Sequence, residues 1–183
     1  GRMVWIADAY TVSGDFPYST RVSSGINYIR NSVKITVDAY DGNITYYLND
    51  PDDPVIRAYA SAFPDLFRPM SDMPLALQSH LRYPEDLFVL QTRQFLTYHM
   101  DNVDVFYNQE DLWAIPTETL EQAAQPVEPY YVILTLPGEE QPEYLLIQPY
   151  TPAGKDNMIA WIAARNNVEN YGELVAYELP KQE

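Results

Sequence analysis

Two histidines are the side chains in this sequence best suited to catalysis or metal binding. His80 and His99 lie 19 positions apart, a spacing that matches neither H-E-x-x-H nor another common metal-ligand pattern. No G-x-S-x-G motif marks a serine nucleophile. The absence of cysteine from the sequence removes thiol nucleophiles and cysteine-based zinc sites. We therefore predict that His80 and His99 are separate from one another and that each has a structural role.

Acidic residues gather in three short segments that could offer oxygen ligands to calcium. They are Asp38, Asp41 and Asn43; Asp50, Asp52 and Asp53; and Asp101, Asn102 and Asp104. Each segment also coincides with an expected turn, helix start or helix exit, where Asp and Asn satisfy backbone groups. An EF-hand starting at Asp38 fails, because Tyr40 and Gly42 occupy ligand positions. We therefore predict that the chain binds no cofactor, and a bound calcium ion is the alternative.

The charge of the chain limits its partners. The 183 residues include 26 acids and 11 Lys or Arg, giving a net charge of −15 at pH 7. Such a surface is repelled by the phosphates of nucleic acid and by anionic lipid headgroups. The 16 tyrosines suit half-exposed sheet faces and interfaces. A protein or a cell-envelope component is therefore the expected partner, and nucleic acid is not.

The clearest local signal is a β-hairpin. Apolar residues alternate with polar ones over 33–40 and again over 44–48, with Asp41-Gly42 between them. Asp-Gly favours a two-residue turn, which predicts that Val37 pairs with Tyr46. The alternation further predicts that Val37 is buried and Thr36 exposed.

Helices and further strands follow along the chain. Asp53-Pro54 predicts the start of a helix that Pro64 ends. A second main helix is expected from Pro84 to about Met100, with Glu85 and Asp86 in its first turn. A brief helix is expected over 109–113, and 116–129 is expected to be an exposed loop. Further strands are expected over 3–10, over 130–136 paired with 144–147, and over 158–164 paired with 172–179.

These elements together predict an α+β fold. Its antiparallel sheet is built from hairpins, and its two main helices pack on one face. We expect residues 1–183 to form a single domain or a fragment of one. No apolar run approaches 18 residues, so no segment is expected to span a membrane.

Several long strings resemble one protein family over nearly the whole chain. They are WIADAYT (5–11), INYIRNSVK (26–34), VDAYDG (37–42), FPDLF (63–67), HLRYPEDLF (80–88) and NMIAW (157–161). The sequence is similar to the large bacterial membrane proteins of uncharacterised protein family 0182. The resemblance implies a parent with transmembrane helices and an extracytoplasmic region to which this chain belongs, on the outer side of the cell membrane. It brings no established activity.

Two functional hypotheses remain. The first is a non-enzymatic extracytoplasmic binding or interaction domain of an integral membrane protein. The second is a hydrolase that acts on envelope material with carboxylates or a metal. Convergence of the family-like polar residues in one pocket would favour the enzyme. These candidates are Arg30, Asn31, Asp38, His80, Arg82 and His99.

Overall fold

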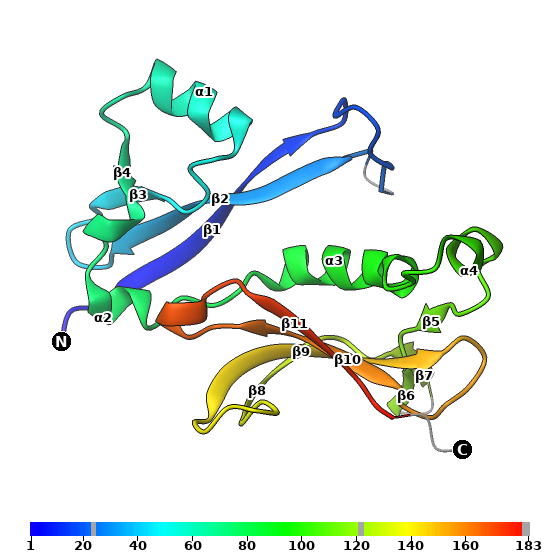
Figure 1. The fold of residues 1–183 in the computed structure, drawn as a ribbon. Helices are drawn as coiled ribbons and strands as arrows, with labels where there is room; N and C mark the ends of the chain where they lie inside the picture. Colours follow the sequence, from blue (N-terminus) through cyan, green and yellow to red (C-terminus); the bar gives the residue numbers. More distant parts are fainter. Residues whose placement is uncertain (23–24, 121–122, 181–183) are drawn as a thin grey trace. The chain divides into compact units, whose positions relative to one another are not determined.

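The structure is a computed structural model that describes residues 1–22, 25–120 and 123–180 (Figure 1). Its elements group into two compact units, Gly1–Leu87 and Phe88–Glu183. Whether the two units behave as the single domain expected from the sequence stays a prediction. Among the helices described in these ranges, none is long and apolar enough to cross a membrane.

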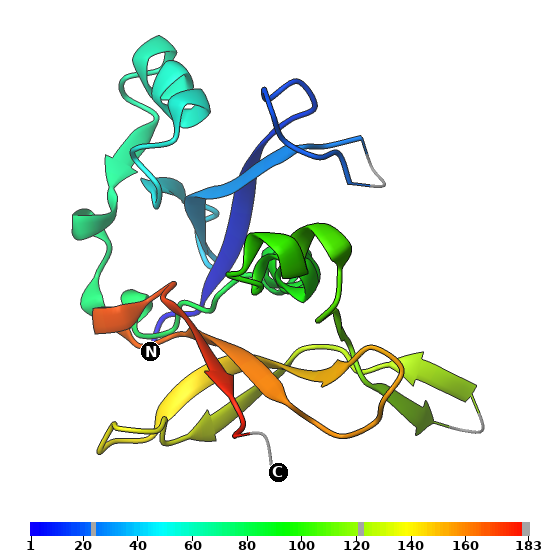
Figure 2. The same cartoon turned by 45° about the vertical axis from the view of Figure 1, so that its right-hand side comes forward.

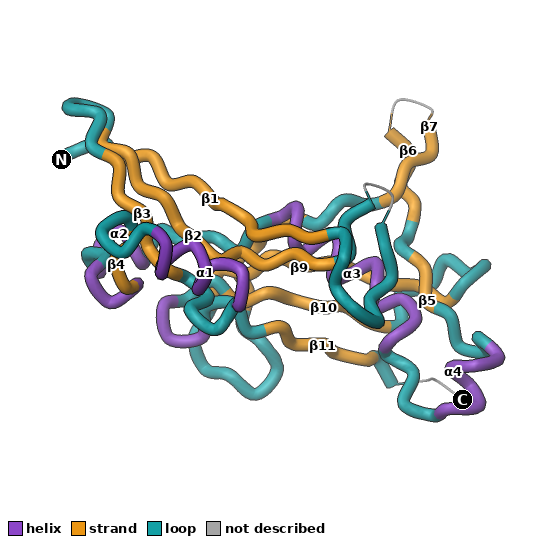
Figure 3. The backbone as a smooth tube through the Cα atoms, turned by 90° about the horizontal axis from the view of Figure 1, so that it is seen from above, coloured by secondary structure: helices purple, strands orange, loops and turns teal. Residues whose placement is uncertain are grey.

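The first unit is built on a four-stranded sheet in the order β1-β2-β3-β4 (Figure 3). The strands are β1 (Val4–Ser13), β2 (Tyr28–Asp38), β3 (Ile44–Leu48) and β4 (Phe67–Pro69). The first three are antiparallel neighbours, and β4 runs parallel to β3. The strand predicted over residues 3–10 is thereby confirmed as β1.

The predicted hairpin between β2 and β3 forms, but its register differs from the expected one by two residues. Val37 pairs with Ile44 and not with Tyr46. The two-residue Asp41-Gly42 turn is therefore wrong, and a longer connection replaces it. The Gly42 N–H donates to the Asp38 carbonyl at 2.9 Å, and the Asp38 carboxylate accepts from the Tyr40 N–H at 2.9 Å. These bonds favour the longer turn because they satisfy backbone groups within it.

At residues 36 and 37 of β2, burial is the opposite of the expected pattern. Thr36 is buried, whereas Val37 is partly exposed. The backbone at Arg82 lies against the side of β2 that holds Lys34. Thr36 lies on the same side, because side chains alternate along a strand. The Lys34 Nζ lies 3.4 Å from the Arg82 carbonyl oxygen. Local alternation could not reveal this contact, because Arg82 is far away in sequence.

The helix predicted at Asp53-Pro54 is α1 (Pro54–Ala62). The Asp53 carboxylate caps it by accepting from the backbone N–H groups of Val55 and Ile56, and Pro54 occupies the first turn. Two short helices follow in the same unit, η1 (Met70–Asp72) and α2 (Leu75–Gln78). Figure 2 shows α1 beside one face of the first sheet.

The second main helix is α3 (Glu85–Tyr98), which confirms the helix predicted from Pro84 to about Met100. It packs on the sheet of the second unit: the Tyr150 hydroxyl donates to the Thr92 carbonyl at 2.9 Å. The next helix is α4 (Val103–Asn108), capped by Asn102, so the brief helix predicted over 109–113 is wrong. Gln109 adopts a left-handed conformation that ends α4.

The second unit is built on a five-stranded sheet. Four strands follow the order β11-β10-β9-β5, and β8 also pairs with β9. The strands are β5 (Trp113–Ala114), β8 (Tyr130–Leu134), β9 (Glu143–Pro152), β10 (Ala160–Arg165) and β11 (Leu174–Glu178). A short helix, η2 (Val168–Asn170), joins the last two. The β8–β9 and β10–β11 pairs confirm the two strand pairs predicted from the sequence. Leu136, Leu145, Ile147 and Ala163 form the core beneath them.

The segment expected as an exposed loop contains two short strands. They are β6 (Thr117–Leu120) and β7 (Ala123–Pro126), which pair antiparallel. The exposure is confirmed at 117–119 and 123–126. The expected lack of regular structure is wrong there, and residues 121–122 lie outside the described ranges. A paired backbone can form on an exposed, polar segment because its hydrogen bonds need no apolar face.

The α+β class, with antiparallel hairpins and two main helices, is confirmed. The strands divide between separate sheets, and each long helix packs against its own sheet. The pocket described next lies within the first unit.

Candidate functional site

A pocket of about 400 Å³ lies in the first unit, between α1 and the first sheet. Most of its wall is apolar or aromatic. From the sheet come Ala9, Val33, Ile35 and Tyr46, and from α1 come Val55, Ile56 and Tyr59. Leu66 and Phe67 close the side next to β4. A concave, largely apolar site of this size suits a small ligand or an inserted side chain.

Local sequence patterns explain how the walls form. Val55, Ile56 and Tyr59 lie at helical spacing, so one stripe of α1 faces the sheet. Ala9 pairs with Val33, and Ile35 pairs with Tyr46, which places these side chains in cross-strand rows. The aromatic ring of Tyr46 packs edge-on against Phe67 with ring centroids 6.3 Å apart. The rim is open, since Tyr59 and Leu66 are exposed.

A buried carboxylate stands beside the pocket wall at Thr11. Asp53 accepts hydrogen bonds from the hydroxyl groups of Thr11 at 2.6 Å, Tyr28 at 2.5 Å and Ser32 at 2.8 Å. It also accepts from the backbone N–H groups of Val55 and Ile56, both at 3.1 Å. We call Asp53 and these three hydroxyl residues the Asp53 cluster.

Hydrogen bonds within the Asp53 cluster stabilise the negative charge of Asp53. Asp53 is only 3% exposed. Burial acts to raise the pKa of its carboxyl group, but the bonds from Thr11, Tyr28, Ser32 and the Val55 N–H outweigh burial and lower this pKa. Burial and the neighbouring carboxylate raise the pKa of Tyr28 to about 12. At neutral pH an ionised Asp53 therefore receives five donors, which leaves it poorly suited to act as a general base.

A β-bulge brings the cluster together. The register between β1 and β2 shifts between Ala9 and Thr11, where β2 contains one extra residue. At the bulge, the Ser32 hydroxyl points toward Asp53. The backbone carbonyl of the neighbouring Asn31 accepts a hydrogen bond from the Asn49 side-chain amide at 2.8 Å. Sequence reasoning identified Asp53 as a helix cap but missed the three hydroxyl partners, because no local pattern marks the bulge.

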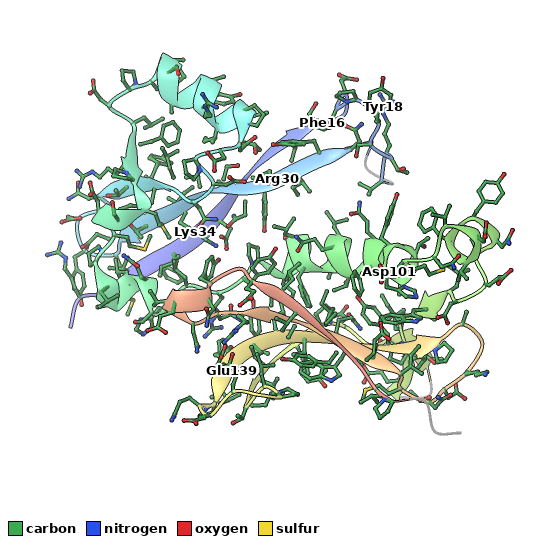
Figure 4. All side chains as sticks on the ribbon, viewed as in Figure 1. Phe16, Tyr18, Arg30, Lys34, Asp101 and Glu139 are labelled. Carbon is green, nitrogen blue, oxygen red and sulfur yellow. The ribbon has the colours of Figure 1, made fainter. Side chains whose placement is uncertain are left out.

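Three candidate residues from the sequence lie on β2, and each has a local partner. Arg30 is exposed, donates to the Ile29 carbonyl at 2.9 Å and lies 5.0 Å from the Tyr28 ring (Figure 4). Asn31 belongs to the bulge. Asp38 sits at the hairpin turn, where Arg2 binds it and lowers the pKa of its carboxyl group. Asn31 and Asp38 are seven positions apart on an extended strand, or roughly 23 Å.

The other three candidates follow the same pattern. His80 directs its Nδ1 to the Ala76 carbonyl at 2.7 Å, and Arg82 is an exposed residue of the next loop. His99 lies in the second unit, with Nδ1 2.9 Å from the Phe95 carbonyl and Nε2 2.9 Å from the Asp111 carbonyl. Its ring stacks on Trp113 with centroids 3.7 Å apart. Each histidine therefore has backbone partners in its own unit.

Two buried cations lie outside the pocket. Lys34 pairs with Asp8; burial lowers its pKa, and Asp8 opposes that effect. Arg165 binds Glu143, Glu139 and Glu173 in the second unit. Within the described ranges, no group of three or more His, Asp or Glu side chains is arranged to hold a metal ion. The acidic segments proposed for calcium bind Arg2 or cap helices, as Asp53 and Asn102 do.

The chain was compared with known proteins. The family model described as Uncharacterised protein family (UPF0182) matches residues 1–183. The chain is 52% identical to a UPF0182 protein of Desulforamulus reducens over 184 residues, 50% identical to one of Pelotomaculum thermopropionicum over 183, and 51% identical to one of Nostoc sp. over 180. These alignments cover 100%, 100% and 98% of the chain, and 20%, 20% and 18% of the relatives.

The chain thus spans about a fifth of the length of the curated relatives it matches. No solved structure matches it. The match over the full chain confirms the family resemblance seen in the sequence: the chain belongs to Uncharacterised protein family (UPF0182).

Proposed function

We propose that this chain is a non-enzymatic binding domain, exposed on the outer face of a membrane protein, and that the first unit holds its ligand site. The supporting observation is the open pocket of about 400 Å³ between α1 and the sheet. Its apolar and aromatic walls can bury a ligand group, and the hydroxyl groups of Tyr46 and Tyr59 can orient one.

The candidates for catalysis favour binding over hydrolysis. A hydrolytic site needs a nucleophile or activated water next to a base that still has a free lone pair. Ser32 and Thr11 are buried, and Asp53 already accepts five hydrogen bonds. The six family-like polar residues have local structural partners or exposed loop positions rather than a common pocket.

The lining and the charge of the chain define the ligand class. The walls present rings and aliphatic groups, so the inserted group is apolar or aromatic. The net charge of −15 favours neutral or cationic ligands over anions. A neutral or basic segment of a partner protein, or an uncharged group of an envelope polymer, fits both conditions.

The pocket can be tested with Nile red, a neutral apolar dye whose fluorescence rises on burial. We expect the dye to bind the 183-residue chain, and Val55→Trp, which fills the pocket, to weaken binding by about tenfold. Tyr40→Ala is the matched control, because Tyr40 is an exposed aromatic residue outside the pocket lining. Equal dye binding by wild type and Val55→Trp would contradict the assignment.

The outer location needs a separate experiment. The sequence has no cysteine, so Tyr107→Cys introduces one thiol at a position that is 86% exposed. In intact cells that express the full-length parent, we expect a membrane-impermeant maleimide to label this variant. The unsubstituted parent measures background labelling. Labelling that requires permeabilised cells would show that the domain faces inward.

A further inference from the structure

The first strand of the first sheet has an unprotected edge. Among the described residues, β1 pairs with β2 alone and forms the end of the sheet. It is ten residues long and contains no Pro, Lys or Arg; its single charged residue, Asp8, binds Lys34. The opposite edge, β4, is three residues long and contains Arg68 and Pro69. Short length, charge and proline are features that protect an edge from pairing. β1 is long, has no proline, and its one charge is held in an ion pair.

Hydrogen bonds at the ends of β1 define which backbone groups face outward. The carbonyl oxygen of Met3 accepts from the Ala39 N–H at 3.1 Å, so Met3 faces β2. Antiparallel pairing alternates the direction of backbone groups. Trp5, Ala7 and Ala9 therefore face β2, whereas the N–H and C=O groups of Ile6 and Asp8 face away from the sheet. These outward groups can form a ladder with another extended strand.

An apolar row next to this edge is also uncovered. Trp5 pairs with Val37, and Val37 pairs with Ile44, so the three side chains form one cross-strand row. Trp5 is 66% exposed and Ile44 is 52% exposed. An exposed tryptophan in an apolar row is typical of a surface that another segment covers.

We propose that the outer edge of β1 accepts an extended strand from another part of the same parent polypeptide. This strand would pair with Ile6 and Asp8 and extend the sheet, with an apolar side chain over Trp5. The relatives are about five times as long as the aligned chain, so the parent has ample sequence to supply it. A second copy is a poorer occupant, because two chains of charge −15 repel each other. For the same reason, the added strand carries neutral or basic side chains.

Amide hydrogen exchange in the purified full-length parent tests the proposal, with β1 containing its own control. Single-residue exchange rates are measured for Trp5, Ile6, Ala7 and Asp8. If the added strand is present, we expect the outward amides of Ile6 and Asp8 to exchange within about tenfold of the inward amides of Trp5 and Ala7. Ile6→Pro, which removes one outward donor, should speed exchange at Asp8, whereas Ile6→Ala should not.

An alternating pattern, with Ile6 and Asp8 exchanging about a hundredfold faster than Trp5 and Ala7, would overturn the proposal. So would protection that appears only when sedimentation shows a dimer, because a second copy would then be the occupant. Should Ile6→Pro fail to fold, the wild-type pattern still decides between these outcomes. The pocket is not involved in this measurement, and Nile red binding therefore succeeds or fails independently.

Discussion

At the scale of single residues, Asp53 combines three structural tasks. It caps α1, it receives the hydroxyl groups of β1 and β2, and it remains ionised while buried. A buried carboxylate without a cation partner is stable only when hydrogen bonds replace its lost hydration. The five donors on Asp53 supply that replacement and attach the helix to the sheet beside the pocket.

Replacement of Asp53 should therefore cost stability. Asp53→Asn retains the size and the capping oxygen but removes the charge that attracts the donors of Thr11, Tyr28 and Ser32. We expect a loss of about 2–4 kcal/mol in the free energy of unfolding, measured by urea denaturation. Asp52→Asn, at the exposed position immediately before Asp53, should change the free energy of unfolding by less than about 0.5 kcal/mol. Equal losses in the two variants would mean that the cluster contributes nothing specific.

The acid stability of the protein should depend on the same residue. The pKa of Asp53 is lower in the folded state than its ordinary value of about 3.9, so the unfolded state takes up the proton first as pH falls. The contribution of Asp53 is complete above about pH 5 and declines progressively below about pH 4. Urea unfolding at a series of pH values should show this decline in wild type and a shallower one in Asp53→Asn. Parallel curves for the two proteins would contradict the prediction.

At the scale of elements, the turn of the β2–β3 hairpin determines which residues pair across the two strands. The register differs from the predicted one by two residues, and a shift of two preserves which residues share a face of the sheet. The cross-strand partners change, however, and so does the length of the connection. Gly42 keeps the positive φ that the sequence indicated, at 72°.

Gly42→Val should weaken this hairpin by about 1 kcal/mol or more, because a β-branched residue resists positive φ. A side chain at this position meets open space, so the cost arises from the backbone and not from a clash. Gly42→Asn is the matched control, since Asn tolerates the left-handed region. The melting temperature should fall more for Val than for Asn. The turn assignment is contradicted if the Val variant melts with the wild type.

At the scale of the whole molecule, acids outnumber bases by 26 to 11, and several of the basic residues that the structure describes bind carboxylates. Arg2, Arg21, Lys34 and Arg165 each bind a carboxylate, and Lys34 and Arg165 are buried. Basic side chains held in this way contribute little to an exposed positive patch. The surface is therefore acidic in effect as well as in net charge, and it is suited to neutral or basic partners.

Nucleic acid should consequently not bind. We expect no measurable association of the chain with a DNA duplex at physiological salt, assayed by fluorescence anisotropy. A small basic protein of similar size provides the positive control. Micromolar duplex binding would show that a positive patch exists despite the net charge of −15.

The sequence by itself determined the elements whose signals are local. Asp53-Pro54 marked the start of α1, and Pro84 with Glu85 and Asp86 marked the start of α3, because capping and helix electrostatics act within one turn. Apolar segments and the turns between them identified most of the strands and three of the antiparallel pairs, β2–β3, β8–β9 and β10–β11. Long strings of residues, rather than any chemical motif, identified the family.

Only the tertiary structure decided the site. Thr11, Tyr28 and Ser32 lie 42, 25 and 21 residues before Asp53, and a bulge in β2 is needed to bring them together. The same holds for the buried Lys34, whose ammonium group lies 3.4 Å from the carbonyl oxygen of Arg82, 48 residues later in the chain. Such contacts depend on register and on packing between distant segments, and the free energies that select them arise only when the chain is folded.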